Sequence, residues 1–148
     1  MKKQSGFTLI ELLLVLAIIG IISAIAIPAL LGQRERAKAK AVMANVNNIA
    51  SECVRINDTA KEAGNVLAAG TIVTSVLGMS NYLPATAKNP YNGGLAAYVA
   101  AGGVNGQVQA VGGAVVDVTG SSYSAVTITG SYLVGGVAQT MVKVVALD

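Results

Sequence analysis

Glu11 is the residue whose type and position point most directly to specific chemistry in this chain. It is the one charged side chain between Phe7 and Leu31. A carboxylate in hydrocarbon costs free energy, so a charged residue inside an apolar segment is by default functional and has a partner. The alternative is that Glu11, lying near the end of the segment, only reaches the lipid headgroups.

The rest of the composition argues against catalysis. The chain has no histidine and no tryptophan, so it lacks the commonest general base and zinc ligand. The glycines of Gly102–Gly113 are not followed by the Lys-Ser/Thr pair of a phosphate-binding loop. After Glu62 the only acidic residues are Asp117 and Asp148, too few for a calcium site. We therefore expect no enzyme activity, no cofactor and no metal site.

The segment that positions Glu11 is long enough to cross a membrane. Residues 1–6, MKKQSG, are short and basic, and they lead directly into an apolar run over residues 7–31. As a helix this run would extend about 37 Å, against about 30 Å for the hydrocarbon core of a bilayer. We expect residues 1–6 to be a targeting leader and residues 7–31 to be the transmembrane half of a longer helix.

The helical pattern continues beyond the apolar run as an amphipathic half, residues 32–57. Asn57, Asp58 and Gly64 mark its expected end. The apolar stripe steps by four and three residues and consists of Val42, Val46, Ile49, Cys53 and Ile56. Cys53 is the only cysteine, so no disulfide can form within the chain, and its place on the stripe predicts a buried, unreactive thiol.

The remainder of the sequence predicts a connecting region, residues 58–94, and a β-sheet head, residues 95–148. The connecting region contains an expected helix at Thr71–Leu77 and a loop at Tyr82–Gly94. The pattern of glycine-separated apolar segments indicates an antiparallel meander, with strands at Leu95–Ala101, Gln107–Val111, Ala114–Thr119, Ser124–Thr129 and Val137–Leu147. The fold class is therefore α+β, a long N-terminal helix covering one apolar face of a sheet.

Two details of the strands carry expectations of their own. Val116 with Val118, and Val126 with Ile128, alternate with polar residues and should mark the buried face of the sheet. Because no disulfide is available, the last segment, Thr140–Leu147, should be held by strand pairing alone.

Charge gives no sign of nucleic-acid binding. The net charge of +3 falls to +1 once Lys2 and Lys3 are removed with the leader. From Asp58 onward there are three lysines and four acids in 91 residues. A surface with so few charges suggests close packing against neighbouring molecules, or cover by glycans.

The N-terminus carries a family resemblance. Gly6–Leu13 reads GFTLIELL, with a basic leader before it and Gly20 and Pro28 after it. This resembles the N-terminus of type IV prepilins and their pseudopilin relatives, over Lys2 to about Pro28. Beyond that point only the plan of a long helix on a sheet and an Asn-Pro-Tyr loop at residues 89–91 are similar.

The resemblance implies processing and assembly. A prepilin peptidase would cut between Gly6 and Phe7 and methylate the new Phe7 amine, leaving a chain of 142 residues. Glu11 would pair with the Phe7 amine of a neighbouring subunit in the filament. The segment from Gly20 to Pro28, weak as a helix because of these two residues, would unwind within filaments; a tolerated kink in a membrane helix is the alternative.

The implied partners are further copies of the chain in a homopolymeric filament, the prepilin peptidase, an inner-membrane assembly platform, and the lipid bilayer before assembly. The precursor would lie in the bacterial inner membrane and the product in an extracellular pilus. Four basic residues follow the apolar run, namely Arg34, Arg36, Lys38 and Lys40, with only Glu35 to offset them. We favour contact with lipid headgroups for this basic cluster over pairing between subunits.

Two other functions stay open. A pseudopilin of a type II secretion system would share leader, helix and fold but form a short periplasmic assembly. An ordinary secreted binding protein is the second, because Ala24-Ile25-Ala26 matches a signal-peptidase site. Glu11 within the apolar segment and Pro28 just after that cut oppose it. Electron transfer along aromatic residues is unsupported, since the five tyrosines all lie after residue 81.

Overall fold

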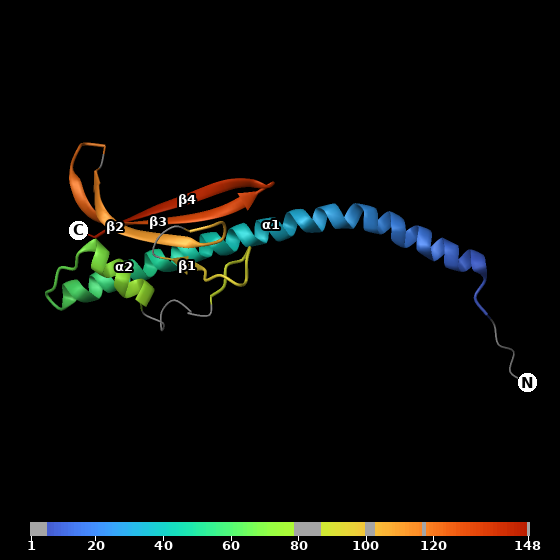
Figure 1. Cartoon of the computed structure of the whole chain (residues 1–148), viewed down its shortest axis with the longest axis horizontal. Coiled ribbons are helices and arrows are strands. Elements are labelled where there is room, and N and C mark those ends of the chain that lie inside the picture. The colour runs from blue at the N-terminus through green and yellow to red at the C-terminus, as the bar shows by residue number, and fades with distance from the viewer. Residues whose placement is uncertain (1–5, 79–86, 100–102, 117, 148) are drawn as a thin grey trace, which may run out of the picture. The chain divides into compact units, whose positions relative to one another are not determined.

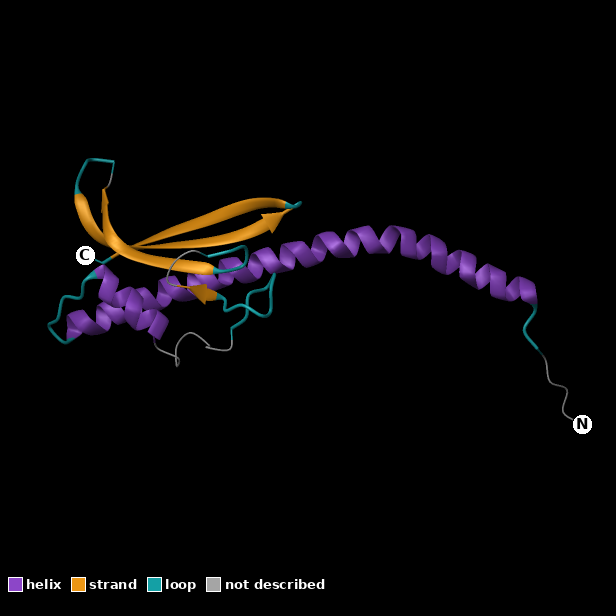
Figure 2. Ribbon diagram, in the orientation of Figure 1, coloured by secondary structure: helices purple, strands orange, loops and turns teal. Residues whose placement is uncertain are grey.

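The computed structural model has the predicted α+β architecture of a long helix and a mostly antiparallel sheet (Figures 1 and 2). It describes residues 6–78, 87–99, 103–116 and 118–147. The elements are α1 (Leu9–Glu62), α2 (Ala69–Gly78), β1 (Tyr98–Val99), β2 (Val108–Val116), β3 (Ser122–Val134) and β4 (Val137–Ala146). The chain divides into two units, Met1–Arg34 and Glu35–Asp148, and all the strands lie in the second.

In the first unit, α1 has no protein core to pack against. Every described side chain from Gly6 to Leu31 is exposed except Ser23, which is half-buried. The helix contains an 18-residue window of mean hydropathy 2.9 with none of it buried, which makes it long and apolar enough to cross a membrane. It begins at Leu9 rather than at the predicted Phe7.

In the second unit, the predicted stripe of α1 forms the core with the sheet and α2. Val42, Val46, Ile49 and Cys53 are fully buried, and Ile56 is half-buried against them. They share one apolar cluster with β2, β3 and α2 residues, among them Val108, Val126, Ile128, Ile72 and Val76. The prediction that the amphipathic half covers the sheet is confirmed.

The end of α1 differs from the prediction. The helix continues to Glu62, and Gly64 alone acts as the stop signal. The N–H of Gly64 donates to the Lys61 carbonyl and the N–H of Asn65 to the Ala60 carbonyl, both at 2.9 Å. With φ +75° at Gly64, these two bonds form a Schellman motif.

The predicted helix at Thr71–Leu77 is confirmed as α2. The close packing of α2 on the sheet explains why the prediction of two strands nearby was wrong. Gln107–Val111 and Ala114–Thr119 were expected as two strands with a turn at Gly112-Gly113. They form the single strand β2, which ends at Val116. A Cβ at Gly112 would overlap the backbone of Ala69 and Gly70 at the start of α2. Gly112 is therefore needed for contact between helix and strand, not for a turn.

The sheet has the order β1-β2-β3-β4, and its antiparallel character is only partly as predicted. β2, β3 and β4 form antiparallel pairs, but β1 pairs with β2 in parallel. The predicted strand Leu95–Ala101 is reduced to Tyr98–Val99, with residues 100 and 101 outside the described part. The β3–β4 turn at Gly135-Gly136 is confirmed, both residues having positive φ as a two-residue hairpin requires.

The predicted alternation of apolar residues is right for β3 and wrong for the end of β2. Val126 and Ile128 are fully buried. Val116 and Val118 are 63% and 105% exposed, because the β2–β3 hairpin extends beyond the helices that cover the sheet (Figure 1).

The C-terminal segment is held by more than strand pairing. The side-chain amide of Asn57, which was expected to mark the helix end, is buried and donates to the Leu147 carbonyl at 3.4 Å. The Lys143 ammonium donates to the Asn47 side chain at 3.0 Å. Side chains of α1 therefore anchor β4 in addition to its pairing with β3.

The Asn-Pro-Tyr loop is hydrogen-bonded to the segment before β2 and to the end of β3. The Asn89 side chain is buried, accepts from the Tyr91 N–H at 2.7 Å and donates to the Asn105 carbonyl at 2.9 Å. The Tyr91 hydroxyl accepts from the Leu133 N–H at 3.0 Å. Gly106 has φ +93°, and a Cβ there would overlap the Asn89 side chain.

We predict that Gly112→Ala destabilises the chain by about 2 kcal/mol or more, because its methyl group must displace helix backbone rather than a flexible side chain. Gly113→Ala is the matched control, since a Cβ at Gly113 meets open space. The control should change the free energy of unfolding by less than about 0.5 kcal/mol. Urea unfolding of the full chain in detergent measures both. Equal effects of the two substitutions would contradict the packing role of Gly112.

Candidate assembly site

The N-terminus of α1 is closed by a capping box made of Thr8 and Glu11. The Glu11 Oε2 accepts hydrogen bonds from the Thr8 N–H at 2.8 Å and the Thr8 hydroxyl at 2.7 Å. In return the Glu11 N–H donates to the Thr8 hydroxyl at 3.4 Å. Thr8 is thus the N-cap residue and Glu11 the third helical residue, which explains why the helix begins at Leu9.

The capping box gives Glu11 a partner within its own chain. Thr8 was not predicted as a partner of Glu11, for which only a basic group was expected. The signal was present as the Thr-x-x-Glu pattern at residues 8–11, which precedes an apolar run. All atoms of the box belong to Thr8 and Glu11, so removal of residues 1–6 would leave it intact. The carboxylate would then enter assembly already oriented at the first turn of the helix.

Gly6 and Phe7 lie in non-helical chain immediately before the capping box. Phe7 is 88% exposed and a Cβ at Gly6 would meet nothing within 4 Å, so the Gly6–Phe7 peptide bond is accessible in the described structure. An accessible bond in extended chain is what a peptidase requires. Lys2 and Lys3 of the expected leader lie outside the described residues.

Gly20 and Pro28 lie inside an unbroken stretch of α1. A Cβ at Gly20 would meet nothing within 4 Å, so no neighbour within the chain requires a glycine there. Pro28 cannot donate to the carbonyl four residues before it, which leaves that carbonyl without its helical bond. The expected unwinding concerns assembled filaments and stays a prediction.

Some residues in and beside the basic cluster contact other parts of the fold, and others face solvent. The Glu35 carboxylate accepts from the N–H groups of Gly135 and Gly136, each at 3.1 Å, and so binds the β3–β4 turn. The Lys38 ammonium lies 5.2 Å from the centre of the Tyr91 ring, a cation–π contact. Glu35 therefore holds a turn of the sheet in addition to offsetting the charge of its basic neighbours.

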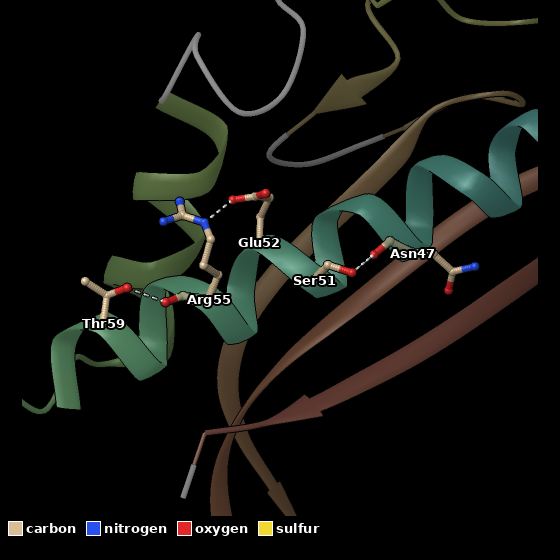
Figure 3. A network of polar contacts seen from close by, with 5 residues as sticks. All are labelled: Asn47, Ser51, Glu52, Arg55 and Thr59. Atoms are coloured by element: carbon tan, nitrogen blue, oxygen red, sulfur yellow. Dashed lines mark hydrogen bonds and ion pairs between the residues drawn. The ribbon is translucent and has the colours of Figure 1, made fainter. Parts of the chain in front are cut away.

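Ser51, Glu52, Arg55 and Thr59 of α1 make their side-chain bonds within the helix (Figure 3). The Arg55 guanidinium pairs with the Glu52 carboxylate at 2.8 Å. The Ser51 hydroxyl donates to the Asn47 carbonyl at 3.0 Å and the Thr59 hydroxyl to the Arg55 carbonyl at 2.8 Å. These are helix-surface bonds and make no catalytic arrangement.

The thiol of Cys53 is inert, as the sequence predicted. Burial, with a smaller contribution from the Glu52 carboxylate, raises the pKa of Cys53 to about 11. The thiol therefore stays protonated at neutral pH, and it has no exposed surface. Within the described residues no three His, Cys, Asp or Glu side chains gather as metal ligands. Asp117 and Asp148 lie outside those residues.

Similarity to known proteins is concentrated at the N-terminus. A model of the prokaryotic N-terminal methylation motif matches residues 1–27. The type IV wide pilus major component PilA4 of Thermus thermophilus is 52% identical over 48 residues, 32% of this chain and 37% of that protein. Fimbrial protein EcpB of Eikenella corrodens is 45% identical over 74 residues, 50% of this chain and 40% of that protein.

A type II secretion relative matches as well. Core protein G of the type II secretion system of Vibrio cholerae is 49% identical over 37 residues, 25% of each chain. The chain thus spans between a quarter and two fifths of the length of these three relatives. No solved structure gives a significant match.

The matched motif covers the residues before α1 and the apolar first half of that helix. Pilins and pseudopilins both appear among the relatives, so the comparisons do not separate the two. The methylation motif over residues 1–27 and these relatives support the type IV pilin and pseudopilin family, whose members are structural subunits rather than enzymes.

Proposed function

We propose that this chain is the major structural subunit of a type IV pilus and polymerises through its N-terminal helix after removal of residues 1–6. The observation that carries the proposal is the uncovered apolar half of α1, in which an 18-residue window of mean hydropathy 2.9 has no buried part. Such a surface requires lipid or other protein around it. Lipid would cover it in the precursor and further copies of the chain would cover it in the filament.

The extent of similarity favours a pilus over a secretion pseudopilus. The fimbrial protein from Eikenella corrodens matches over half of this chain, whereas the secretion protein from Vibrio cholerae matches over a quarter. The pseudopilin alternative keeps support from several core G proteins of type II secretion systems. It predicts an assembly confined to the periplasm, whereas a pilus would be recovered from the cell surface.

A secreted binding protein is less well supported. Cleavage after Ala26 would cut within an unbroken helical stretch and would remove the capping box together with most of the apolar run. Cleavage after Gly6 falls in non-helical chain and leaves both in place.

Glu11 has two successive partners in the proposed mechanism. Before assembly its carboxylate accepts from Thr8, which reduces the cost of a charge in the membrane. During assembly the Phe7 amine of a neighbouring subunit forms an ion pair with the Glu11 carboxylate, which Thr8 cannot do because it carries no charge. An ion pair left half-formed in an apolar core is strongly unfavourable, so the pair would select one axial register between subunits. The prepilin peptidase and an inner-membrane assembly platform are the other proposed partners.

Gly6→Arg is predicted to block processing, because the peptidase would meet a long charged side chain beside the bond to Phe7. The intact mass of the membrane protein should then correspond to 148 residues rather than the 142 of the processed chain. Surface filaments should disappear while the protein persists in the membrane, because an uncut leader would bring Lys2 and Lys3 into the apolar filament core. Filaments built from the uncut chain would refute the leader assignment, and a mass indicating a cut after Ala26 would favour the secreted protein.

Glu11→Ala is predicted to separate membrane insertion from assembly. Removal of the charge should leave the level of membrane monomer unchanged or higher, because the helix becomes more apolar. Filament yield, measured as sheared surface protein per unit of membrane monomer, should fall at least tenfold, since about 1.4 kcal/mol of lost pairing already gives that factor. Thr8→Val serves as the control, because it removes the hydroxyl contact but keeps the charge. An unchanged yield from Glu11→Ala would show that the carboxylate only reaches the headgroups.

A further inference from the structure

The solvent-facing side of α1 in the second unit carries two pairs of charges of opposite sign. Arg36 and Lys40 lie near its beginning, Asp58 and Glu62 near its end, and all four side chains are exposed. In the described part of the chain none of these four has an ion-pair partner, whereas Arg55 is paired with Glu52. Both pairs are like charges four residues apart, which disfavours the helix slightly at each end.

The spacing of the two pairs is the same, and so is their side of the helix. Asp58 follows Arg36 by 22 residues and Glu62 follows Lys40 by 22 residues. That separation is about 33 Å along an α-helix, too far for contact within one copy. At about 100° per residue, a step of 22 residues also brings a side chain to within about 40° of its starting direction around the helix axis. One shift along the helix axis therefore superimposes both basic residues on both acidic ones.

The surface between the two pairs permits the approach of another helix. It consists of short or neutral side chains. All of them are exposed, and Val54 is 44% exposed. The Ser51 hydroxyl is hydrogen-bonded within the helix, and the Lys143 ammonium of β4 donates to the Asn47 side chain, so one cation of the sheet also lies beside this surface. The remaining members are Ala44 and Val54. The apolar stripe of the same helix is on the opposite side, in the core.

The other charges of the basic cluster in this unit are already engaged. Glu35 binds the turn between β3 and β4, and Lys38 lies over Tyr91. Arg36 and Lys40 are thereby left to face outward. At the other end Lys61 lies between Asp58 and Glu62 in sequence, so that end keeps a net charge of −1.

We infer that Arg36 and Lys40 of one copy pair with Asp58 and Glu62 of a second, parallel copy shifted by about 33 Å along the helix. The inference rests on the proposed function, which supplies parallel copies. Contact with anionic lipid would explain the basic end alone, whereas a second copy of this chain explains both ends and their equal spacing. Exposed ion pairs are individually weak and screened by salt, so these contacts select the shift between subunits rather than hold them together.

A zero-length carbodiimide cross-link on intact filaments tests the contact directly. It joins an amine to a carboxylate only where they touch, so a Lys40–Glu62 peptide can come only from two copies. We expect this peptide to be the main cross-link of Lys40 in the mass spectrum. Glu62→Gln should abolish it and Asp58→Gln should leave it. A dominant Lys40–Asp58 link would indicate antiparallel copies and overturn the inference.

Charge reversal gives an independent readout. Arg36→Glu with Lys40→Glu, or Asp58→Lys with Glu62→Lys, should each lower the filament yield at least about fivefold, because two weak attractions become repulsions. Combining all four changes should restore the yield to within about twofold of the unmodified chain. Lys88→Glu, an exposed reversal away from the helix, is the control.

The outcomes separate this contact from the proposed function. Filaments that form normally but lack the Lys40–Glu62 link, or a combined variant that is not restored, would overturn the contact and leave polymerisation standing. Loss of yield only on reversal of the basic pair would assign that pair to lipid. Failure of the unmodified chain to form any filament would overturn both.

Discussion

The structure depends on one constraint: no described part of the chain covers the first half of α1. Sixteen large apolar side chains between Phe7 and Leu31 are each about half exposed or more. Burying one such side chain contributes roughly 1.5 to 3 kcal/mol, so covering this half contributes on the order of 20 kcal/mol, as an upper estimate. An exposed ion pair contributes about 1 kcal/mol or less. In the proposed filament, apolar burial would therefore drive association, and charged residues would decide only how neighbouring copies align.

The second unit is built so that its stability does not depend on how that surface is covered. Its core is closed by residues 35–148 alone, with the α1 stripe, α2 and the sheet in one apolar cluster. Two glycines in the strands permit this packing: Gly112 lies against the start of α2, and Gly130 lies against Val42 and Val46 of α1. Glu35, Asn47 and Asn57 then tie the C-terminal hairpin to the same helix. Under the proposed function, such a subunit would pass from lipid to a polymer without refolding its head.

The sequence predicted the features that follow from periodicity and missed those that depend on tertiary contact. The stripe from Val42 to Ile56, the helix α2 and the turn at Gly135-Gly136 each have a local signature. Gly112-Gly113 has the same local signature as a turn, and only the neighbouring backbone of α2 distinguishes it. Asn57 likewise looks like a helix terminator, because its buried bond to the Leu147 carbonyl joins residues 90 positions apart.

At the candidate site, the sequence identified Glu11 as exceptional but assigned it no partner within its own chain. The partner was local after all, since Thr8 and Glu11 form a capping box whose pattern is readable without a structure. The partners of Glu35 could not be predicted from the sequence. Its carboxylate accepts from the Gly135 and Gly136 N–H groups, about 100 residues away, and no local pattern indicates this contact. The roles of Gly6, Phe7, Gly20 and Pro28 concern processing and the polymer, which lie beyond a single chain.

We propose that copies of this chain replace lipid around the first half of α1. A density map of filaments sheared from the cell surface, obtained by electron cryomicroscopy, tests this directly. We expect residues 7–31 of every copy to lie in a lipid-free core, surrounded by the same residues of neighbouring copies. Surface filaments that contain this chain but leave that segment facing solvent, or a chain recovered only from the inner membrane, would contradict it.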